Sequence, residues 1–434
     1  MPIRLDARDP GFAATFASLV DDRRDSDGDV TATVTAIIAD VARRGDVAVF
    51  ELTEKFDGIN LSPQNIAVSD AEVEAACASI ENDLMVALEH AAARIRAFHE
   101  AQRPADRDAT DSDGIRAGWR WSAVDAAGLY VPGGLASYPS SVLMNAIPAK
   151  VAGVERLVMV TPTPGGRMNP LVLAAARLAG VDTIYRIGGA QAVAALAFGT
   201  ASIAPVDKIV GPGNAYVAEA KRQLYGRVGI DMVAGPSEIL VVADAANDPA
   251  WIAADLMSQA EHDPVAQSIL ITDDAGFADS VCAEIEALLT RLPNPAVARA
   301  SWDRFGAVIV VQSLEQAAGL VNALAPEHLQ IATDDPQHLF NQVRHAGSVF
   351  LGRYTPEAIG DYVGGPNHVL PTGRRARFAS GLSVADFMKR TTFLGCSVPG
   401  LTVVGPSAIA LARAEGLHAH AESVDVRLKE LGKR

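Results

Sequence analysis

The sequence is poor in cysteine and contains no long apolar run. Its three cysteines, Cys77, Cys282 and Cys396, lie far apart and form no CxxC pair. This sparse, odd set excludes a disulfide framework and a thiolate zinc finger, and each cysteine is expected to be a small buried residue. No segment approaches the roughly 18 apolar residues that a membrane-spanning helix needs, and the charged start of the chain lacks the apolar core of a signal peptide. These absences predict a cytoplasmic protein without a membrane partner.

Basic residues are also few. Lys and Arg number 37 against 52 Asp and Glu, which gives a formal net charge of −15, and the basic residues form no stripe. Such a surface repels polyanions, so nucleic acid is excluded as a partner. The 434 residues are 49% hydrophobic. This is enough apolar material for a large core, and the length predicts two or more domains.

Apolar, strand-like segments alternate with helical segments through most of the chain. The expected strands cover residues 128–131, 156–160, 183–187 and 208–210, then 239–242, 268–272, 307–311 and 348–351. The expected helices cover residues 141–151, 171–179, 190–198 and 214–224, then 249–261, 277–292, 314–324 and 336–343. Because strand–helix–strand repeats favour parallel pairing with right-handed crossovers, we predict an α/β fold with two Rossmann-like layered domains.

Small helical extensions are expected at both ends. Residues 1–26 are interpreted as an N-terminal extension. Residues 382–434 are predicted to be mainly helical and to contact a partner chain, because they are too few to hold a core alone. The two α/β domains are assigned to residues 27–127 plus 236–381 and to residues 128–235, with an exposed loop at 103–118.

Three glycine-rich loops follow expected strands and open into expected helices. They read YVPGG at 130–134, IGGAQ at 187–191 and VGPGNAY at 210–216, and neither GxGxxG nor GxxxxGK[ST] occurs. At the carboxyl edge of a parallel sheet, such loops present backbone N–H groups and a helix N-terminus where phosphates bind. Glycines are also common in ordinary tight turns. The pattern therefore leaves a nucleotide site and simple turns as equal alternatives.

Two pairs of polar residues are close in sequence. Gln259 and His262 are three residues apart in an expected helix, so they share a face and can meet one ligand. Glu327 stands beside His328 after an expected helix, and a carboxylate next to an imidazole offers two proton acceptors of different basicity. Helix-end capping or ordinary surface charge explains this second pair equally well.

Histidines and carboxylates gather towards the C-terminus. Six of the nine histidines lie after residue 320. Asp361 and His368 share a glycine-rich loop, and Glu415 precedes His418 and His420. A zinc site recruits such residues from separate segments, although the chain has no HExxH motif. Taken singly, each of these histidines is better explained as a solvated or hydrogen-bonded residue.

Several segments, in their order and spacing, resemble the histidinol dehydrogenase family. The resemblance runs from about residue 30 to the end of the chain. The segments that carry it are YVPGG (130–134), YPSSVLMNA (138–146), VGIDMVAGPSEIL (228–240), SQAEH (258–262), PEHL (326–329), GDYVGGPNH (360–368), and EGL followed by AH (415–420).

The resemblance implies one zinc ion per subunit, NAD as the redox cofactor and L-histidinol as the substrate. It assigns Glu327 as the base that activates water and His328 as the base for the alcohol. The zinc ligands that it implies are Gln259, His262, Asp361 and His420. The residues that match substrate-binding positions are Ser237, Gln259, His262, His328, Asp361, His368, Glu415 and His420, and those that match NAD contacts are Tyr130, Gln191 and Asn214.

The implied activity is an oxidoreductase reaction at the end of histidine biosynthesis, in which L-histidinol is oxidised through L-histidinal to L-histidine. The family forms homodimers with shared active sites, so Glu415 and His420 are expected to serve a second copy of the chain. His418 is the rival of His420 as a ligand. The alternative function is oxidation of another small alcohol, such as a sulfonated diol, on the same scaffold. The presence of His368 and Glu415 favours histidinol.

Overall fold

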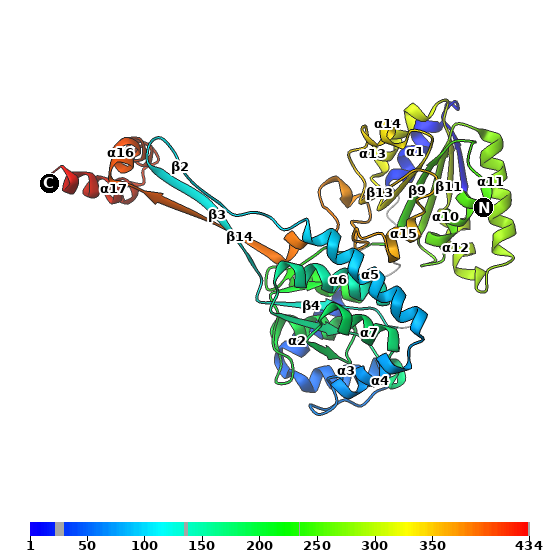
Figure 1. Cartoon of the computed structure of the whole chain (residues 1–434), viewed down its shortest axis with the longest axis horizontal. Helices are drawn as coiled ribbons and strands as arrows, with labels where there is room; N and C mark the ends of the chain where they lie inside the picture. The colour runs from blue at the N-terminus through cyan, green and yellow to red at the C-terminus, as the bar shows by residue number, and fades with distance from the viewer. Residues whose placement is uncertain (22–29, 134–137, 234, 433–434) are drawn as a thin grey trace. The chain divides into compact units, whose positions relative to one another are not determined.

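The computed structural model divides the chain into two compact units (Figure 1). The described residues are 1–21, 30–133, 138–233 and 235–432. The first unit comprises Met1–Gln102 and Asp125–Phe387, and the second comprises Arg103–Val124 and Met388–Arg434. No helix among the described residues is long and apolar enough to cross a membrane.

The first unit contains a parallel six-stranded sheet. Its strands, in spatial order, are β1 (Ile3–Asp6), β11 (Ala307–Val310), β10 (Gln267–Thr272), β9 (Glu238–Ala243), β12 (His328–Ala332) and β13 (Ser348–Leu351). The central strands β9, β10 and β12 are buried along their whole length. Continuous burial of this kind is typical of a parallel sheet that is covered on both faces.

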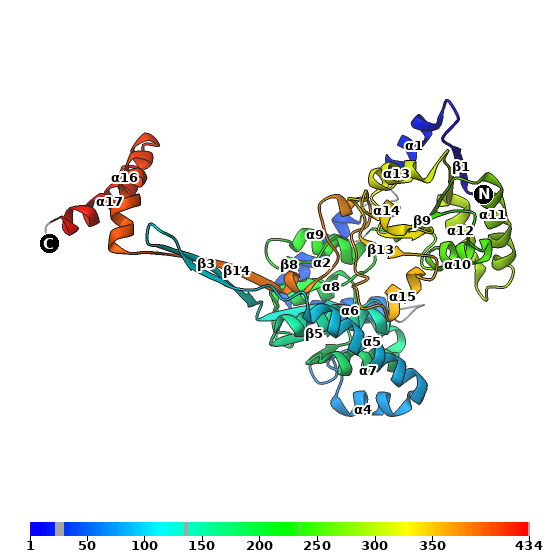
Figure 2. The same ribbon diagram turned by 45° about the horizontal axis from the view of Figure 1, so that its top comes forward.

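Helices cover both faces of this sheet (Figures 1 and 2). One face packs against α10 (Pro249–Ala260), α11 (Ala275–Leu289) and α12 (Pro295–Phe305). The other packs against α1 (Phe12–Asp21), α13 (Ala317–Leu324) and α14 (Pro336–Phe340). Along β9, Val241 belongs to the first cluster and Leu240 and Val242 to the second, as expected from the alternation of side chains along a strand. The short helix α15 (Glu357–Tyr362) packs against α10.

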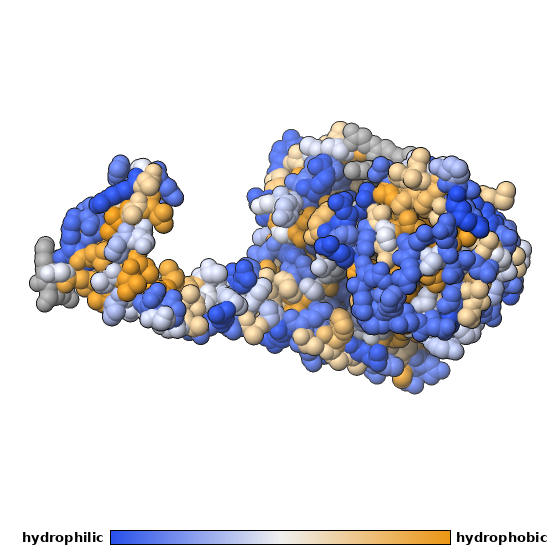
Figure 3. Space-filling view, turned by 90° about the horizontal axis from the view of Figure 1, so that it is seen from above, coloured by the Kyte–Doolittle hydropathy of each residue, from blue (hydrophilic) through white to orange (hydrophobic). Residues whose placement is uncertain are grey.

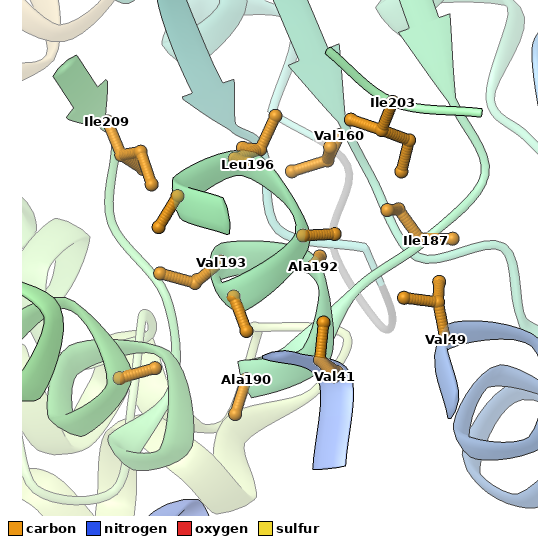
Figure 4. Packing of buried hydrophobic residues seen from close by; sticks show 14 of the residues in the cluster. Val41, Val49, Val160, Ile187, Ala190, Ala192, Val193, Leu196, Ile203 and Ile209 are labelled. Carbon is orange, nitrogen blue, oxygen red and sulfur yellow. The ribbon is translucent and has the colours of Figure 1, made fainter. Parts of the chain in front are cut away.

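A second parallel sheet in the same unit has five strands. In spatial order they are β6 (Thr183–Tyr185), β5 (Arg156–Val160), β4 (Ala126–Tyr130), β7 (Lys208–Val210) and β8 (Gly229–Ile230). An apolar cluster joins it to α2 (Thr31–Arg44), α3 (Asp46–Asp57), α8 (Gly189–Phe198) and α9 (Ala215–Leu224) (Figure 4). A second helical layer contains α4 (Asp70–Ser79), α5 (Asn82–Glu100), α6 (Pro139–Ala152) and α7 (Pro170–Ala179). Short 3-10 segments occur at Pro164–Gly166, Leu314–Gln316, Arg375–Arg377 and Val384–Phe387.

The second unit is an antiparallel three-stranded sheet followed by two helices. Its strands, in spatial order, are β14 (Met388–Cys396), β3 (Ile115–Ala123) and β2 (Arg107–Thr110). The helices are α16 (Val398–Ala414) and α17 (His418–Leu431), which pack against each other.

The α/β fold class is confirmed, and each expected strand and helix overlaps an observed one. The assignment of residues 1–26 as an extension is wrong for Ile3–Asp6, which forms the edge strand β1. Residues 22–26 lie outside the described part of the chain. The assignment of residues 27–127 to the domain of residues 236–381 is also wrong for α2 and α3. Their buried side chains, such as Val34 and Val49, pack against the five-stranded sheet instead.

Three further expectations differ from the structure. Residues 103–118 are predicted to form a loop, but β2 and the start of β3 lie there, and residues 388–396 are a strand rather than a helix. β14 pairs with β3 over a long sequence separation, and all three strands are mostly exposed, so they carry no strong apolar pattern. Cys396 is exposed rather than buried.

A buried ion pair holds the loop after β7. Lys221 and Asp231 form a salt bridge with side chains only 2% and 1% exposed. Lys221 Nζ donates to the carbonyl of Gly211 at 2.9 Å, and the N–H of Gly211 donates to Asp231 Oδ2 at 2.8 Å. Gly211 has φ +109°, and a Cβ at this position would lie 2.1 Å from the carbonyl oxygen of Tyr130. The ion pair therefore fixes a backbone conformation that only glycine can adopt here.

We expect Lys221→Met to destabilise the fold by about 3–5 kcal/mol, because it leaves the Asp231 carboxylate buried without its cation. The double variant Lys221→Met/Asp231→Asn should recover part of this loss. Thermal unfolding followed by circular dichroism measures both effects. Arg299→Met is the matched control, because it breaks an exposed pair with Glu286 that is worth at most about 1 kcal/mol. Equal effects of Lys221→Met and Arg299→Met would contradict the structural role of the buried pair.

Candidate active site

Two buried carboxyl groups face each other where β9 and β12 begin. Glu238 is the first residue of β9, and Glu327 directly precedes β12. The register that pairs His328 with Ile239 places Glu327 beside Glu238. The N–H of Glu238 donates to Glu327 Oε2 at 3.0 Å, and the N–H of Glu327 donates to Glu238 Oε2 at 3.3 Å. Each carboxyl group is thus held by the backbone of the other residue.

Burial makes Glu327 an unusually weak acid. Its side chain is buried, and this desolvation raises the pKa of Glu327 to about 8. The nearby His328 opposes the shift, whereas the carboxyl groups of Glu238 and Glu357 add to it. A carboxylate with such a pKa is a much stronger base than a solvated one, which suits general-base catalysis close to neutral pH.

His328 presents one ring nitrogen for proton transfer. Its Nδ1 lies 3.0 Å from the carbonyl oxygen of Glu238, and a carbonyl accepts only an N–H donor, so the proton resides on Nδ1. Nε2 is buried and has no hydrogen-bond partner among the described residues. It lies 3.9 Å from Asp361 Oδ1. The ring stacks on Phe350, with ring centroids 6.1 Å apart. The imidazole is therefore oriented with Nε2 as the proton acceptor.

A third carboxyl group, Glu357, lies beneath this imidazole and was not identified from the sequence. Its side chain is buried at the start of α15, and Oε1 lies 3.7 Å from His328 Nδ1. Ser258 donates to Oε2 at 3.3 Å. Burial, followed by the charge of Asp361, raises the pKa of Glu357 well above its usual range. In the sequence this glutamate follows a proline at a helix start, where it is indistinguishable from a residue that complements the helix dipole.

Gln259 and His262 come together as their spacing predicts. Helix α10 ends at Ala260, so His262 lies just beyond the helix, and its Nδ1 is 3.0 Å from Gln259 Nε2. Gln259 is fully buried, and its Oε1 has no hydrogen-bond partner among the described residues. His262 keeps solvent exposure, but neighbouring protein atoms displace part of its hydration, and this desolvation lowers its pKa. The negative charge of Asp361 acts in the opposite direction, which indicates that Asp361 lies near this ring.

These residues fit a divalent cation such as zinc. A buried amide oxygen without a donor is unfavourable unless a ligand satisfies it, and Gln259 Oε1 is such an atom. One ligand atom from each of His328, Glu357 and Asp361 lies within 4.8 Å of the other two, and of these three residues Asp361 is the predicted zinc ligand. Amide, imidazole and carboxylate donors together are suitable for zinc.

His368 is held beside Asp361 by helices of the other sheet. Its Nδ1 lies 3.0 Å from the carbonyl oxygen of Asp361, and its Nε2 lies 3.3 Å from Ser141 Oγ in α6. Desolvation lowers the pKa of His368. The neighbouring Asn367 donates to the carbonyl of Met144 in α6 at 2.6 Å. Arg94 in α5 donates to the carbonyl of Val363 at 2.6 Å. Helices α5 and α6 thus support the segment that follows α15.

The remaining predicted substrate contacts fall into both units. Ser237 directly precedes Glu238 and is partly exposed. Glu415 caps the C-terminal end of α16 and His420 lies in α17, and both are exposed in the second unit. The role of each as a site residue stays a prediction.

The predicted NAD contacts lie at the carboxyl edge of the five-stranded sheet. Gly188 and Gly189 open α8, and Asn214 caps α9 by accepting from the N–H groups of Tyr216 and Val217. Tyr130 and Gln191 are buried, and the Tyr130 hydroxyl accepts from the N–H of Gly189 at 3.0 Å. The loops are positioned as predicted, with Gly134 outside the described residues. These side chains shape the loops, and their contact with NAD stays a prediction.

We expect Glu327→Gln to stabilise the protein increasingly as the pH rises. The pKa of Glu327 is raised from 4.5 to about 8 in the folded state, so folding favours the protonated form. That contribution is complete below about pH 4.5 and is lost as the pH rises through 8. The difference in melting temperature between the variant and the wild type should therefore grow between these pH values and then level off. A difference that does not change with pH would contradict the raised pKa.

The comparisons with known proteins agree with this geometry. A family model described as histidinol dehydrogenase matches residues 21–428. The chain is 63% identical to the histidinol dehydrogenase of Zymomonas mobilis, over 99% of this chain and 100% of that protein. It is also 63% identical to that of Rhodospirillum rubrum, over 99% of each. The crystal structure of histidinol dehydrogenase from Elizabethkingia anophelis superposes with a TM-score of 0.94 at 37% identity, over 99% of both chains. This chain therefore belongs to the histidinol dehydrogenase family.

Proposed function

We propose that this chain oxidises L-histidinol to L-histidine through L-histidinal, with NAD as the oxidant, at the end of histidine biosynthesis. The observation that carries the proposal is the pair of buried bases at the start of β12. Glu327 has a pKa raised to about 8, and His328 Nε2, which has no hydrogen-bond partner in the described part of the chain, points away from the carbonyl that anchors Nδ1. A carboxylate and an imidazole at one site suit two successive oxidations that remove different protons.

His328 serves the alcohol step. Its Nε2 accepts the hydroxyl proton of L-histidinol, and the hydrogen bond from Nδ1 to the carbonyl of Glu238 stabilises the imidazolium ion that results. When bound, NAD accepts the hydride that leaves the same carbon in each of the two oxidations. The binding residues proposed for it are Tyr130, Gln191 and Asn214, beside the N-termini of α8 and α9.

Glu327 serves the aldehyde step. Its carboxylate accepts a proton from water while the water oxygen forms a bond to the aldehyde carbon of L-histidinal and the π electrons of the C=O bond move to the carbonyl oxygen. These electrons re-form the C=O bond when the hydride leaves. The hydrated carbon then carries the hydrogen that leaves as hydride in the second oxidation, and the product is a carboxylic acid. Because both steps use one site, the reactive aldehyde stays away from bulk solvent.

Gln259, His262 and Asp361, together with His420, would hold zinc. When bound, the ion would supply a Lewis acid that anchors the nitrogen donors of the substrate. The buried Oε1 of Gln259, which lacks a hydrogen-bond partner within the described ranges, supports this assignment. Ser237, His368 and Glu415 complete the proposed substrate contacts.

We also propose that the chain is a homodimer in which Glu415 and His420 serve the active site of the second copy. The second unit is rich in exposed apolar side chains, which Figure 3 shows as orange areas near the C-terminus. They include Leu394, Val398, Val403, Leu411 and Val426. Exposed apolar patches of this kind mark protein interfaces.

The central test measures NADH formation by the purified protein with L-histidinol and NAD, with and without a zinc chelator. We expect two NADH per L-histidinol, loss of activity on chelation and recovery when zinc is added. His262→Ala should lose both zinc, measured by elemental analysis, and activity, while its circular dichroism spectrum stays unchanged. If a folded, zinc-loaded protein does not turn over L-histidinol, another small alcohol is the substrate. Zinc retained at full stoichiometry by His262→Ala would contradict the ligand assignment.

A second prediction separates the roles of the two bases. With L-histidinal as the common substrate, Glu327→Gln should slow oxidation by NAD about 10²–10⁴-fold, because general-base catalysis contributes that much. Reduction of L-histidinal by NADH needs no activated water and should be largely retained. Stopped-flow absorbance of NADH measures both directions. An equal loss in both would remove the proposed division of labour.

A further inference from the structure

Glu238 contacts both proposed bases, although neither the family resemblance nor the proposed mechanism gives it a role. Its side chain is 7% exposed. Its Oε2 accepts from the N–H of Glu327, and its Oε1 accepts from the N–H of Gly373 at 3.2 Å. Its own N–H donates to the Glu327 carboxyl group, and its carbonyl accepts from His328 Nδ1. One residue thus provides four hydrogen bonds around the two bases.

This arrangement is not required by the sheet. The residues that follow Glu238 in β9 are all apolar, and a buried carboxyl group next to a second one is unfavourable. The side chain of Glu238 contributes two of the four contacts, and both anchor backbone segments next to the site. One is the N–H of Glu327 itself, and the other is the loop at Gly373. The negative charge of Glu238 also raises the pKa of Glu327, so it makes the neighbouring carboxylate a stronger base.

We infer that Glu238 is a positioning residue for the second oxidation, in which its carboxylate fixes the backbone of Glu327 and thereby aims the base at water. The inference rests on the proposed function. The two oxidation steps should depend on this side chain to different degrees. The backbone carbonyl of residue 238 anchors His328, and this carbonyl remains whichever side chain occupies position 238. Removal of the carboxylate therefore affects the base for water more than the base for the alcohol.

The test uses Glu238→Gln in the zinc-loaded full-length protein, with L-histidinal and either NAD or NADH. We expect oxidation to slow about tenfold or more relative to reduction, because a displaced base loses part of the 10²–10⁴-fold that general-base catalysis provides. Ser301→Ala is the matched control. It removes a buried hydrogen bond to the carbonyl of Ala266 in the same α/β layer, and it should leave the ratio of the two rates unchanged.

The pH profile gives an independent readout. The ionisable groups that act on Glu327 are Glu238 from β9, His328 from β12 and Glu357 from α15. Loss of the Glu238 charge lowers the pKa of Glu327, so the acid limb of the profile for L-histidinal oxidation should move to lower pH in Glu238→Gln. A purely structural role would not move this limb.

Failure of this inference and failure of the proposed function give different results. An unchanged ratio of rates together with an unchanged acid limb in folded Glu238→Gln would overturn the inference, while wild-type turnover would leave the proposed function intact. No turnover of L-histidinal by the wild type would instead overturn the proposed function. If Glu238→Gln does not fold, Glu238→Asp serves in its place. It keeps the charge but draws the oxygens away from the Glu327 backbone, so the ratio should fall in the same direction.

Discussion

The paired burial of Glu238 and Glu327 is the constraint on which the rest of the site depends. Two carboxyl groups can be taken out of water here because adjacent strands of one parallel sheet offer each of them a backbone N–H from the other. The β9–β12 register places the two residues side by side, so that the N–H of each reaches the carboxyl group of the other. A slip of one residue would turn the side chains of β12 to opposite faces. Therefore the apolar side chains that fix the register, such as Leu240 and Leu329, also determine the basicity of Glu327.

The proposed acid–base residues lie at the amino edge of the six-stranded sheet, whereas ligands of open α/β sheets generally bind at the carboxyl edge. Topology alone would therefore point to the wrong edge. Strand β12 was also not recognised from the sequence, because it begins with His328 and contains Gln330 in place of a continuous apolar run. Gln330 is buried because its amide donates to Asp255 at 2.7 Å, a partner 75 residues away that no local pattern reveals.

Local signals did predict part of the site. The three-residue spacing of Gln259 and His262 placed them in contact, and apolar runs located β9 and β10 of the six-stranded sheet and β4, β5 and β7 of the five-stranded sheet. Glu238 and Glu357 escaped detection because a glutamate at the start of a strand or helix is usually solvated, and only tertiary packing buries these two. The roles of Glu327 and His328 came from the family resemblance. The sequence places Glu327 next to His328, but this adjacency fits helix-end capping as well as it fits a pair of catalytic bases.

The two parallel sheets present different chemical groups at their edges. At the carboxyl edge of the five-stranded sheet, the shape comes from backbone packing: a Cβ on Gly188 would lie 2.4 Å from Pro162, and Asn214 is occupied in capping α9. At the amino edge of the six-stranded sheet, reactivity comes from desolvated side chains. His368 connects the two, since it bonds both the Asp361 backbone and Ser141 in α6. A preformed backbone edge would suit the proposed dinucleotide, which must exchange between the two oxidations, whereas the buried carboxyl and imidazole groups would suit a substrate that must stay bound.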